Sequence, residues 1–160
     1  MISFKVVSLP EHPQHWLTAA EWSYAAWRHE FPSDTVQTYL DQYALAASDS
    51  QRLIEVFAAI DSDEKLLGVA TLVDDDELPD ALEPGPWLAA VFVNPDARKF
   101  GVGSALVERV VSRTRELDYS TLYLYTEHAQ AWYLGKGWTK IREIVFLGLN
   151  HTVMQLELVR

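Results

Sequence analysis

The sequence contains no cysteine, few positive charges and no long apolar run. Without cysteine there is no disulfide scaffold, zinc ribbon, iron–sulfur site or thiol nucleophile. The longest wholly apolar run, from Trp87 to Val93, is far too short to cross a membrane. The N-terminal segment lacks a charged start followed by an apolar core, so no signal peptide is expected. These absences favour a cytoplasmic enzyme or binding domain.

The charge is strongly acidic: 13 Lys and Arg residues face 23 Asp and Glu residues, which gives a net charge of −10 at pH 7. Such a field repels nucleic acids and anionic membranes unless a local basic stripe overrides it, and the sequence has no such stripe. We therefore expect neither a nucleic acid nor a membrane as a partner. The charge favours an amine-bearing partner instead.

The chain has the size and composition of one globular domain covering residues 1–160, with 49% hydrophobic and 22% charged residues. Apolar periodicity predicts strands and helices that alternate in the second half, as in a mixed α/β sheet. The expected strands are Ile2–Val7, Leu53–Ile60, Lys65–Val73, Trp87–Val93, Thr121–Thr126, Trp138–Leu147 and Thr152–Leu158. Expected helices run from Trp16 towards Pro32, from a cap at Ser33 to Ala47, from Arg98 to Leu117 and from His128 to Leu134.

The most informative segment is VFVNPDARKFGVGS, from Val91 to Ser104, in which an apolar strand turns into a glycine-punctuated helix start. The first turn of a helix presents backbone N–H groups without intrahelical partners, and the helix dipole adds about +0.5 charge there. Gly101 and Gly103 remove side chains that would keep a ligand away, while Arg98 and Lys99 add positive charge. The segment therefore predicts an anion site that suits a pyrophosphate.

A loop before an ordinary helix is the plain alternative, because short glycine patterns are common. A GxxxxGK[ST] phosphate loop does not fit, since Ser104 and Ala105 follow Gly103. A dinucleotide-binding GxGxxG does not fit either, since Leu106 occupies the place of the third glycine.

The run V-x-N-P-x-x-R-x-x-G-x-G-S-A-L resembles the acetyl-CoA motif of the GNAT superfamily of N-acetyltransferases. The later segment AWYLGKGW, residues 131–138, resembles the second signature of that superfamily. Both motifs occur in the family's order, with a strand between them. The resemblance implies a single α/β domain with a mixed, mostly antiparallel seven-stranded sheet, splayed fourth and fifth strands and about four flanking helices.

The same resemblance implies that acetyl-CoA is the co-substrate and lies between the splayed strands. The residues expected to bind it are Val91, Phe92, Val93, Arg98, Lys99, Phe100, Gly101, Val102, Gly103 and Ser104. Val91 and Val93 would contact the acetyl and pantetheine groups through their backbones, and the segment 98–104 would hold the pyrophosphate. Lys99 departs from the family, which often has glycine there.

The resemblance also assigns Tyr133 as the general acid that protonates the departing thiolate. A base is harder to identify, because Leu88, Ala89 and Ala90 stand where relatives place a carboxylate. Glu127 is the expected base by location, and a water chain to bulk solvent is an equal alternative. For Glu83 and His128 a solvated surface position is expected.

The implied function is transfer of acetyl from acetyl-CoA to a primary amine of a small molecule or peptide, by direct attack and without a covalent enzyme intermediate. The alternatives are a non-catalytic acyl-CoA-binding or regulatory module of the same fold, and an interaction protein that only shares the fold. No metal is expected, because His12, His15, His29 and His151 show no metal-ligand spacing and are expected to gain nothing from carboxylate neighbours. The identity of the acceptor stays open, as does the formation of a homodimer through the last strands.

The acidic run from Asp74 to Glu77 is expected to border the substrate side, as a solvated loop or as an attraction for cationic amines.

Overall fold

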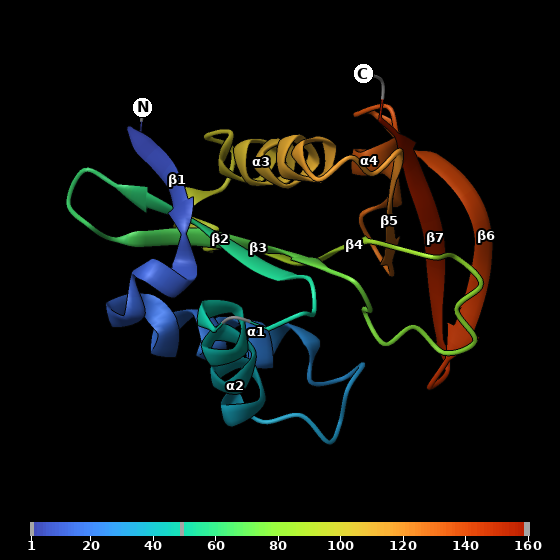
Figure 1. The fold of residues 1–160 in the computed structure, drawn as a ribbon, viewed down its shortest axis with the longest axis horizontal. Coiled ribbons are helices and arrows are strands. Elements are labelled where there is room, and N and C mark those ends of the chain that lie inside the picture. The colour runs from blue at the N-terminus through green and yellow to red at the C-terminus, as the bar shows by residue number, and fades with distance from the viewer. Residues whose placement is uncertain (1, 49, 159–160) are drawn as a thin grey trace.

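The computed structural model describes residues 2–48 and 50–158, which fold around one seven-stranded sheet with the order β1-β2-β3-β4-β5-β7-β6 (Figure 1). The strands are β1 (Phe4–Ser8), β2 (Ile54–Asp61), β3 (Leu66–Val73), β4 (Trp87–Val93), β5 (Thr121–Thr126), β6 (Thr139–Phe146) and β7 (Leu149–Glu157). Each predicted strand is present, with ends shifted by at most a few residues. The mixed α/β sheet expected from the sequence is confirmed.

The sheet is antiparallel except at its centre, where β4 and β5 run parallel. Within the described residues their register contains one pair, Trp87 with Tyr123, and the Tyr123 N–H donates to the Pro86 carbonyl at 3.0 Å. Beyond that pair the strands separate, as expected for the splayed fourth and fifth strands. The gap lies towards the carboxyl ends of both strands.

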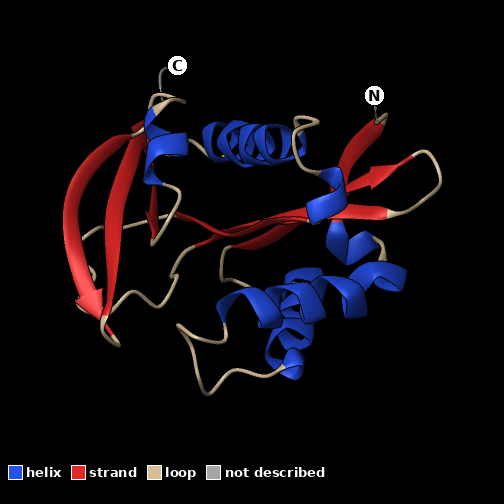
Figure 2. Cartoon of the chain, turned by 180° about the vertical axis from the view of Figure 1, so that it is seen from behind, coloured by secondary structure: helices blue, strands red, loops and turns tan. Residues whose placement is uncertain are grey.

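Helices cover both faces of the sheet (Figures 1 and 2). One face carries α1 (Trp16–Trp27) and α2 (Val36–Ala47), and the other carries α3 (Val102–Glu116) and the short α4 (Gln130–Leu134). Short 3₁₀ turns occur at Leu9–Glu11, Pro13–His15 and Pro95–Ala97. None of the helices formed by residues 2–48 and 50–158 has the length and apolar character needed to span a bilayer.

Three helix starts differ from the expectation. The cap of α2 is Thr35 rather than Ser33, because Thr35 and Thr38 form a reciprocal capping box. The short α4 begins at Gln130 rather than at His128. The third helix begins at Val102 rather than at Arg98. Residues 98–101 instead form a turn after the 3₁₀ segment Pro95–Ala97, and in this turn Lys99 and Gly101 adopt positive φ angles of 71° and 82°. A helix cannot continue through such left-handed residues.

The core has two halves, one on each face of the sheet. Leu106 and Val110 of α3 pack on one face, and Tyr43 of α2 packs on the other. The expectation that the fourth strand is covered on both faces holds for Trp87–Ala89, which is buried, and is wrong for its second half, which is half-buried. That half is more open because it borders the gap towards β5.

β4 contains a bulge at the same place. Residues Ala90 and Val91 together face Ala70 of β3, because the register shifts between Val69 and Thr71. Ala90 adopts a left-handed φ of 52°, a strained conformation for a residue with a side chain. Bulges re-aim backbone groups, and here the bulge takes Val91 out of the ladder with β3 at the edge of the gap.

Gly68 of β3 offers a test of how tightly β3, β4 and α3 pack. A Cβ at this position would lie 2.7 Å from the Phe92 carbonyl oxygen and 3.1 Å from Leu106. We expect Gly68→Ala to lower the free energy of unfolding by about 1–3 kcal/mol in urea titrations, through overpacking. Gly135→Ala is the matched control, because its Cβ would meet atoms no closer than 3.5 Å and should leave stability nearly unchanged.

Candidate active site

Two cavities meet where β4 and β5 separate. The first, about 550 Å³, lies at the start of α3 and is called here the α3 cavity. The second, about 720 Å³, lies beside α1, α2 and the loop between β3 and β4, and is called here the acidic cavity. Both are lined by Val91, Arg98, Ala129 and Tyr133. A molecule in one cavity can therefore approach a molecule in the other at these four residues.

The α3 cavity gathers nearly all the residues expected to hold acetyl-CoA. Those lining it are Val91, Phe92, Val93, Arg98, Lys99, Gly101, Val102, Gly103 and Ser104. Phe100 is the exception, since its side chain is 46% exposed and does not line the cavity. Trp132 also lines it, with Lys136 Nζ 4.7 Å from its ring centroid, and this aromatic wall was not among the residues expected from the sequence.

The turn before α3 has the geometry of an anion-binding loop. Gly101 is the N-cap of α3 in the left-handed region, and a Cβ on Gly103 would lie 3.5 Å from Val93 and 3.8 Å from Trp132. The N–H groups of the first α3 turn lack intrahelical acceptors, and residues 101–104 line the α3 cavity. Lys99 adopts a φ of 71°, which glycine adopts without cost and which explains why relatives often have glycine at this position.

Arg98 is held against the strand. Its Nε donates to the Val93 carbonyl at 3.1 Å, and its guanidinium carbon lies 5.9 Å from the ring centroid of Phe92. The Val93 carbonyl therefore already has a partner, whereas the bulge sets Val91 apart from the β3 ladder. The side chain of Arg98 braces the junction between β4 and the turn.

Tyr133 lies on α4 at the boundary of both cavities, and only 6% of it is exposed. Its ring packs edge-on against Trp132 and Trp138 at centroid distances of 4.9 and 5.5 Å. Thr126 positions this helix, because its hydroxyl oxygen accepts a hydrogen bond from the Ala129 N–H at 3.0 Å. Burial raises the pKa of the Tyr133 phenol above its ordinary value, so the phenol keeps its proton.

Carboxylates dominate the acidic cavity. Those lining it are Glu30, Asp34, Asp41, Asp75, Asp76, Glu77 and Glu127. Burial, together with the nearby Glu77, Glu30 and Asp75, raises the pKa of Asp76 well above its usual value. Asp74 instead pairs with Arg52 at 2.8 Å, which lowers the pKa of its carboxyl. The acidic run of the sequence thus borders the cavity, as expected.

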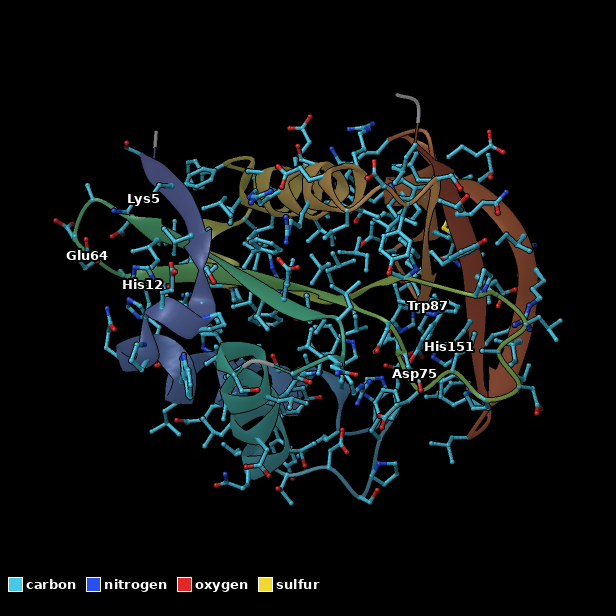
Figure 3. All side chains as sticks on the ribbon, in the orientation of Figure 1. Lys5, His12, Glu64, Asp75, Trp87 and His151 are labelled. Atoms are coloured by element: carbon cyan, nitrogen blue, oxygen red, sulfur yellow. The ribbon has the colours of Figure 1, made fainter. Side chains whose placement is uncertain are left out.

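Aromatic rings form the remaining wall of the acidic cavity. Trp27 of α1 lines it. The Tyr125 hydroxyl donates to the Asp76 carbonyl at 2.7 Å and holds the acidic loop against β5. Figure 3 places Asp75, Trp87 and His151 on the same side of the molecule, far from His12.

Glu127 also lines this cavity and lies between two histidines. Its Oε2 is 3.1 Å from His29 Nε2, and its Oε1 is 3.1 Å from His128 Nε2. His151 Nε2 lies 2.6 Å from Glu30 Oε1. The expectation that His29 and His151 gain nothing from carboxylate neighbours is therefore wrong, because the partners come from segments distant in the sequence. His128 is exposed, as expected, but touches Glu127.

One cluster among the described residues has metal-ligating atoms close together: those of His29, Glu30 and Glu127 lie within 4.8 Å of one another. The contacts above already satisfy these groups through hydrogen bonding. The expectation that no metal is bound stays a prediction.

Glu83 is not a solvated surface residue. It accepts two hydrogen bonds from the Arg142 guanidinium, at 3.0 and 2.9 Å, and its side chain is 8% exposed. Arg142 lowers the pKa of this carboxyl. The pair fastens the loop between β3 and β4 to β6, and Glu83 lines neither cavity.

Comparisons with solved structures agree with this architecture. An acetyltransferase from Acinetobacter baylyi superposes with a TM-score of 0.78 at 17% identity, covering 99% of this chain and 93% of that one. An acetyltransferase from Salmonella typhimurium, solved with acetyl-CoA, gives 0.73 at 16% identity, covering 100% and 95%. Spermidine N-acetyltransferase from Vibrio cholerae, solved with CoA and spermine, gives 0.72 at 14% identity, covering 98% and 96%.

Sequence comparison finds matches that cover about half of this chain. Amino-acid acetyltransferase from Pseudomonas putida is 32% identical over 87 residues, which are 54% of this chain and only 19% of that protein. The same enzyme from Azotobacter vinelandii matches over the same length at 32% identity. The model of the acetyltransferase (GNAT) family matches residues 16–136, which include both the turn before α3 and Tyr133. The chain therefore belongs to the GNAT acetyltransferase family.

Proposed function

We propose that this protein transfers the acetyl group of acetyl-CoA to a cationic primary amine by direct attack. The observation that carries the proposal is the meeting of two unlike cavities at Tyr133. The α3 cavity offers backbone donors to an anion, and the acidic cavity offers carboxylates to a cation. A thioester in one and an amine in the other would touch at the strand gap.

Acetyl-CoA fits the α3 cavity for local electrostatic reasons. Its negative charges face a protein of net charge −10, so the overall field opposes binding. The first turn of α3, its dipole and Lys99 supply the local attraction. The Val91 backbone, displaced by the bulge, is the group we assign to the pantetheine arm and the acetyl carbonyl.

The acidic cavity favours an amine without a carboxylate of its own. Of its two arginines, Arg52 is paired with Asp74, and Arg98 lies at the boundary with the α3 cavity, where its Nε donates to the Val93 carbonyl. An amino acid would bring a carboxylate next to unpaired acidic groups, which costs free energy. A diamine or polyamine would instead neutralise them and favour the ionised form of Asp76. The likeness to a spermidine acetyltransferase agrees with this choice, although its identity is low.

The chemistry requires a base and an acid. An alkylamine with a pKa of about 10.4 must lose a proton before it can attack, and Glu127 is the carboxylate we assign to that step. As the carbon–sulfur bond breaks, the phenol of Tyr133 donates a hydrogen bond and then a proton to the departing thiolate. The raised pKa of Tyr133 keeps it protonated for this role.

Gly103→Ala tests the cofactor site. The added Cβ makes ordinary contacts with Val93 and Trp132, so the fold should persist, but it occupies the floor of the α3 cavity. We expect the Kd for acetyl-CoA to rise about ten-fold, a loss of about 1.4 kcal/mol, in isothermal titration calorimetry. Unchanged affinity would place the cofactor elsewhere.

Tyr133→Phe tests the acid. We expect kcat to fall about a hundred-fold with little change in acetyl-CoA affinity, because only proton donation is lost. Tyr119→Phe is the control, since Tyr119 is exposed and lines neither cavity. Equal turnover in wild type and Tyr133→Phe would remove Tyr133 from the mechanism.

A panel of amines tests the acceptor class. Thiol release from acetyl-CoA should be fastest with putrescine or spermidine and at least ten-fold slower in kcat/KM with glutamate, because the unpaired carboxylates repel the latter. High salt should narrow this difference. Tight acetyl-CoA binding with no thiol release from any amine would contradict catalysis and favour a non-catalytic module.

A further inference from the structure

Three segments far apart in the sequence bring imidazoles and carboxylates into one line beside the acidic cavity. The exposed fractions of the side chains fall along it: 83% for His128, 50% for His29, 16% for Glu127, 7% for Glu30 and 0% for His151. The line thus runs from solvent, past the cavity, into the core. Glu127 is the point at which an exposed imidazole and the cavity meet.

Each oxygen of Glu127 has its own imidazole. His29 approaches Oε2 from the loop after α1, and His128 approaches Oε1 from the end of β5, both at 3.1 Å. Neither histidine is buried, so each can exchange protons with water. A proton that arrives on Glu127 therefore has a titratable group within hydrogen-bond distance on both sides.

The inner end of the line is closed. His151 is fully buried, its Nδ1 lies 3.1 Å from the Leu149 carbonyl and its Nε2 lies 2.6 Å from Glu30. Its ring is stacked on Phe146 at a centroid distance of 4.1 Å. Because a carbonyl can only accept, Nδ1 carries a hydrogen, and a single proton bridges Nε2 and Glu30. This pair holds Glu30 in place and has no route to water through His151.

We propose that His29 and His128 act through Glu127 to carry the proton lost by the acceptor amine from the acidic cavity to solvent, an inference that rests on the proposed function. The Glu30–His151 pair anchors the inner end, so the proton moves outward. His29 and His128 also line the acidic cavity, but they act through the Glu127 carboxylate that both contact, and in this sense they are positioning residues.

The proton balance requires such an outlet. An alkylammonium and acetyl-CoA give an N-alkylacetamide, CoA thiol and one proton. Nitrogen forms the new bond to the carbonyl carbon, the carbon–sulfur bond breaks, and nitrogen loses two protons in all. One reaches the sulfur through Tyr133, and the other leaves through Glu127, a histidine and water. An isolated carboxylate, with an ordinary pKa of about 4.3, would hold that proton poorly, whereas imidazole releases it near neutral pH.

Other charges also surround this point and contribute to any pH profile. Besides His29, Glu127 and His128, the charged and titratable groups that line the same cavity are Glu30, Asp34, Tyr39, Asp41, Arg52, Asp75, Asp76, Glu77, Arg98, Tyr125 and Tyr133. Most of these groups are acidic, and together their charges influence the ionisation of every titratable group in the cavity. The test below therefore compares variants at each pH instead of assigning a single ionisation to one residue.

The experiment compares kcat/KM for spermidine between wild type and the double variant His29→Gln/His128→Gln from pH 6.5 to 10. Glutamine retains a hydrogen-bond donor near the Nε2 position but cannot carry a proton. We expect a deficit of about ten-fold at pH 7.5 that narrows as the pH nears about 10, where roughly a quarter of the amine is already neutral. Each single variant should show part of the deficit.

His12→Gln is the matched control, because this imidazole also makes a hydrogen bond, to the Ser8 carbonyl, but lies at the opposite end of the sheet (Figure 3). It should leave kcat/KM unchanged. A deficit in the double variant that is constant across pH, or no deficit at all, would overturn the relay while leaving the proposed function intact. A wild-type enzyme that turns over no amine would overturn both.

Rescue gives a second readout. His29→Ala/His128→Ala leaves exposed space beside Glu127, and added free imidazole should restore several-fold of the lost rate at pH 7.5. The same concentration should not affect the wild type. Failure of imidazole to raise the rate, with acetyl-CoA affinity retained, would contradict proton transfer through these side chains.

Discussion

The separation of β4 from β5 is the constraint on which the rest of the structure depends. Trp87 and Tyr123 pair at the root of the gap, and beyond them each strand leaves main-chain groups without a neighbouring strand. Burying such groups unpaired would be costly, so a gap of this kind is stable when water or a ligand fills it. The bulge at Ala90 widens the opening and turns Val91 towards it. Both cavities are consequences of this geometry.

The charge distribution divides the gap into two environments. A net charge of −10 opposes an anionic cofactor at long range, but screening in salt limits that effect to about 8–10 Å. The turn before α3 acts at contact distance, where oriented N–H groups outweigh the mean field. The carboxylates on the other side act on a cation in the same way. Under the proposed function, opposite local fields would bring two unlike substrates to one boundary, where Tyr133 lies.

Two strained backbone positions lie at this boundary. Ala90 and Lys99 adopt left-handed conformations that glycine would adopt more easily, and Gly101 does so without penalty. Such conformations persist only where surrounding packing enforces them. Gly68 allows the Phe92 carbonyl to approach closely, and Arg98 bonds the Val93 carbonyl, so the strained strand end is held from both sides.

The sequence by itself determined the order of strands and helices and the loop that faces the α3 cavity, because both follow from short-range patterns: alternation, helical spacing and contiguous residues from Arg98 to Ser104. It did not determine where α3 begins, since the left-handed φ of Lys99 is not encoded by its residue type. Tertiary structure alone decided the surroundings of the reacting groups. His29 and Glu127 are 98 positions apart, and Glu30 and His151 are 121 apart. Such pairs arise only when the packing of α1 against the sheet brings distant segments together, which no local pattern records.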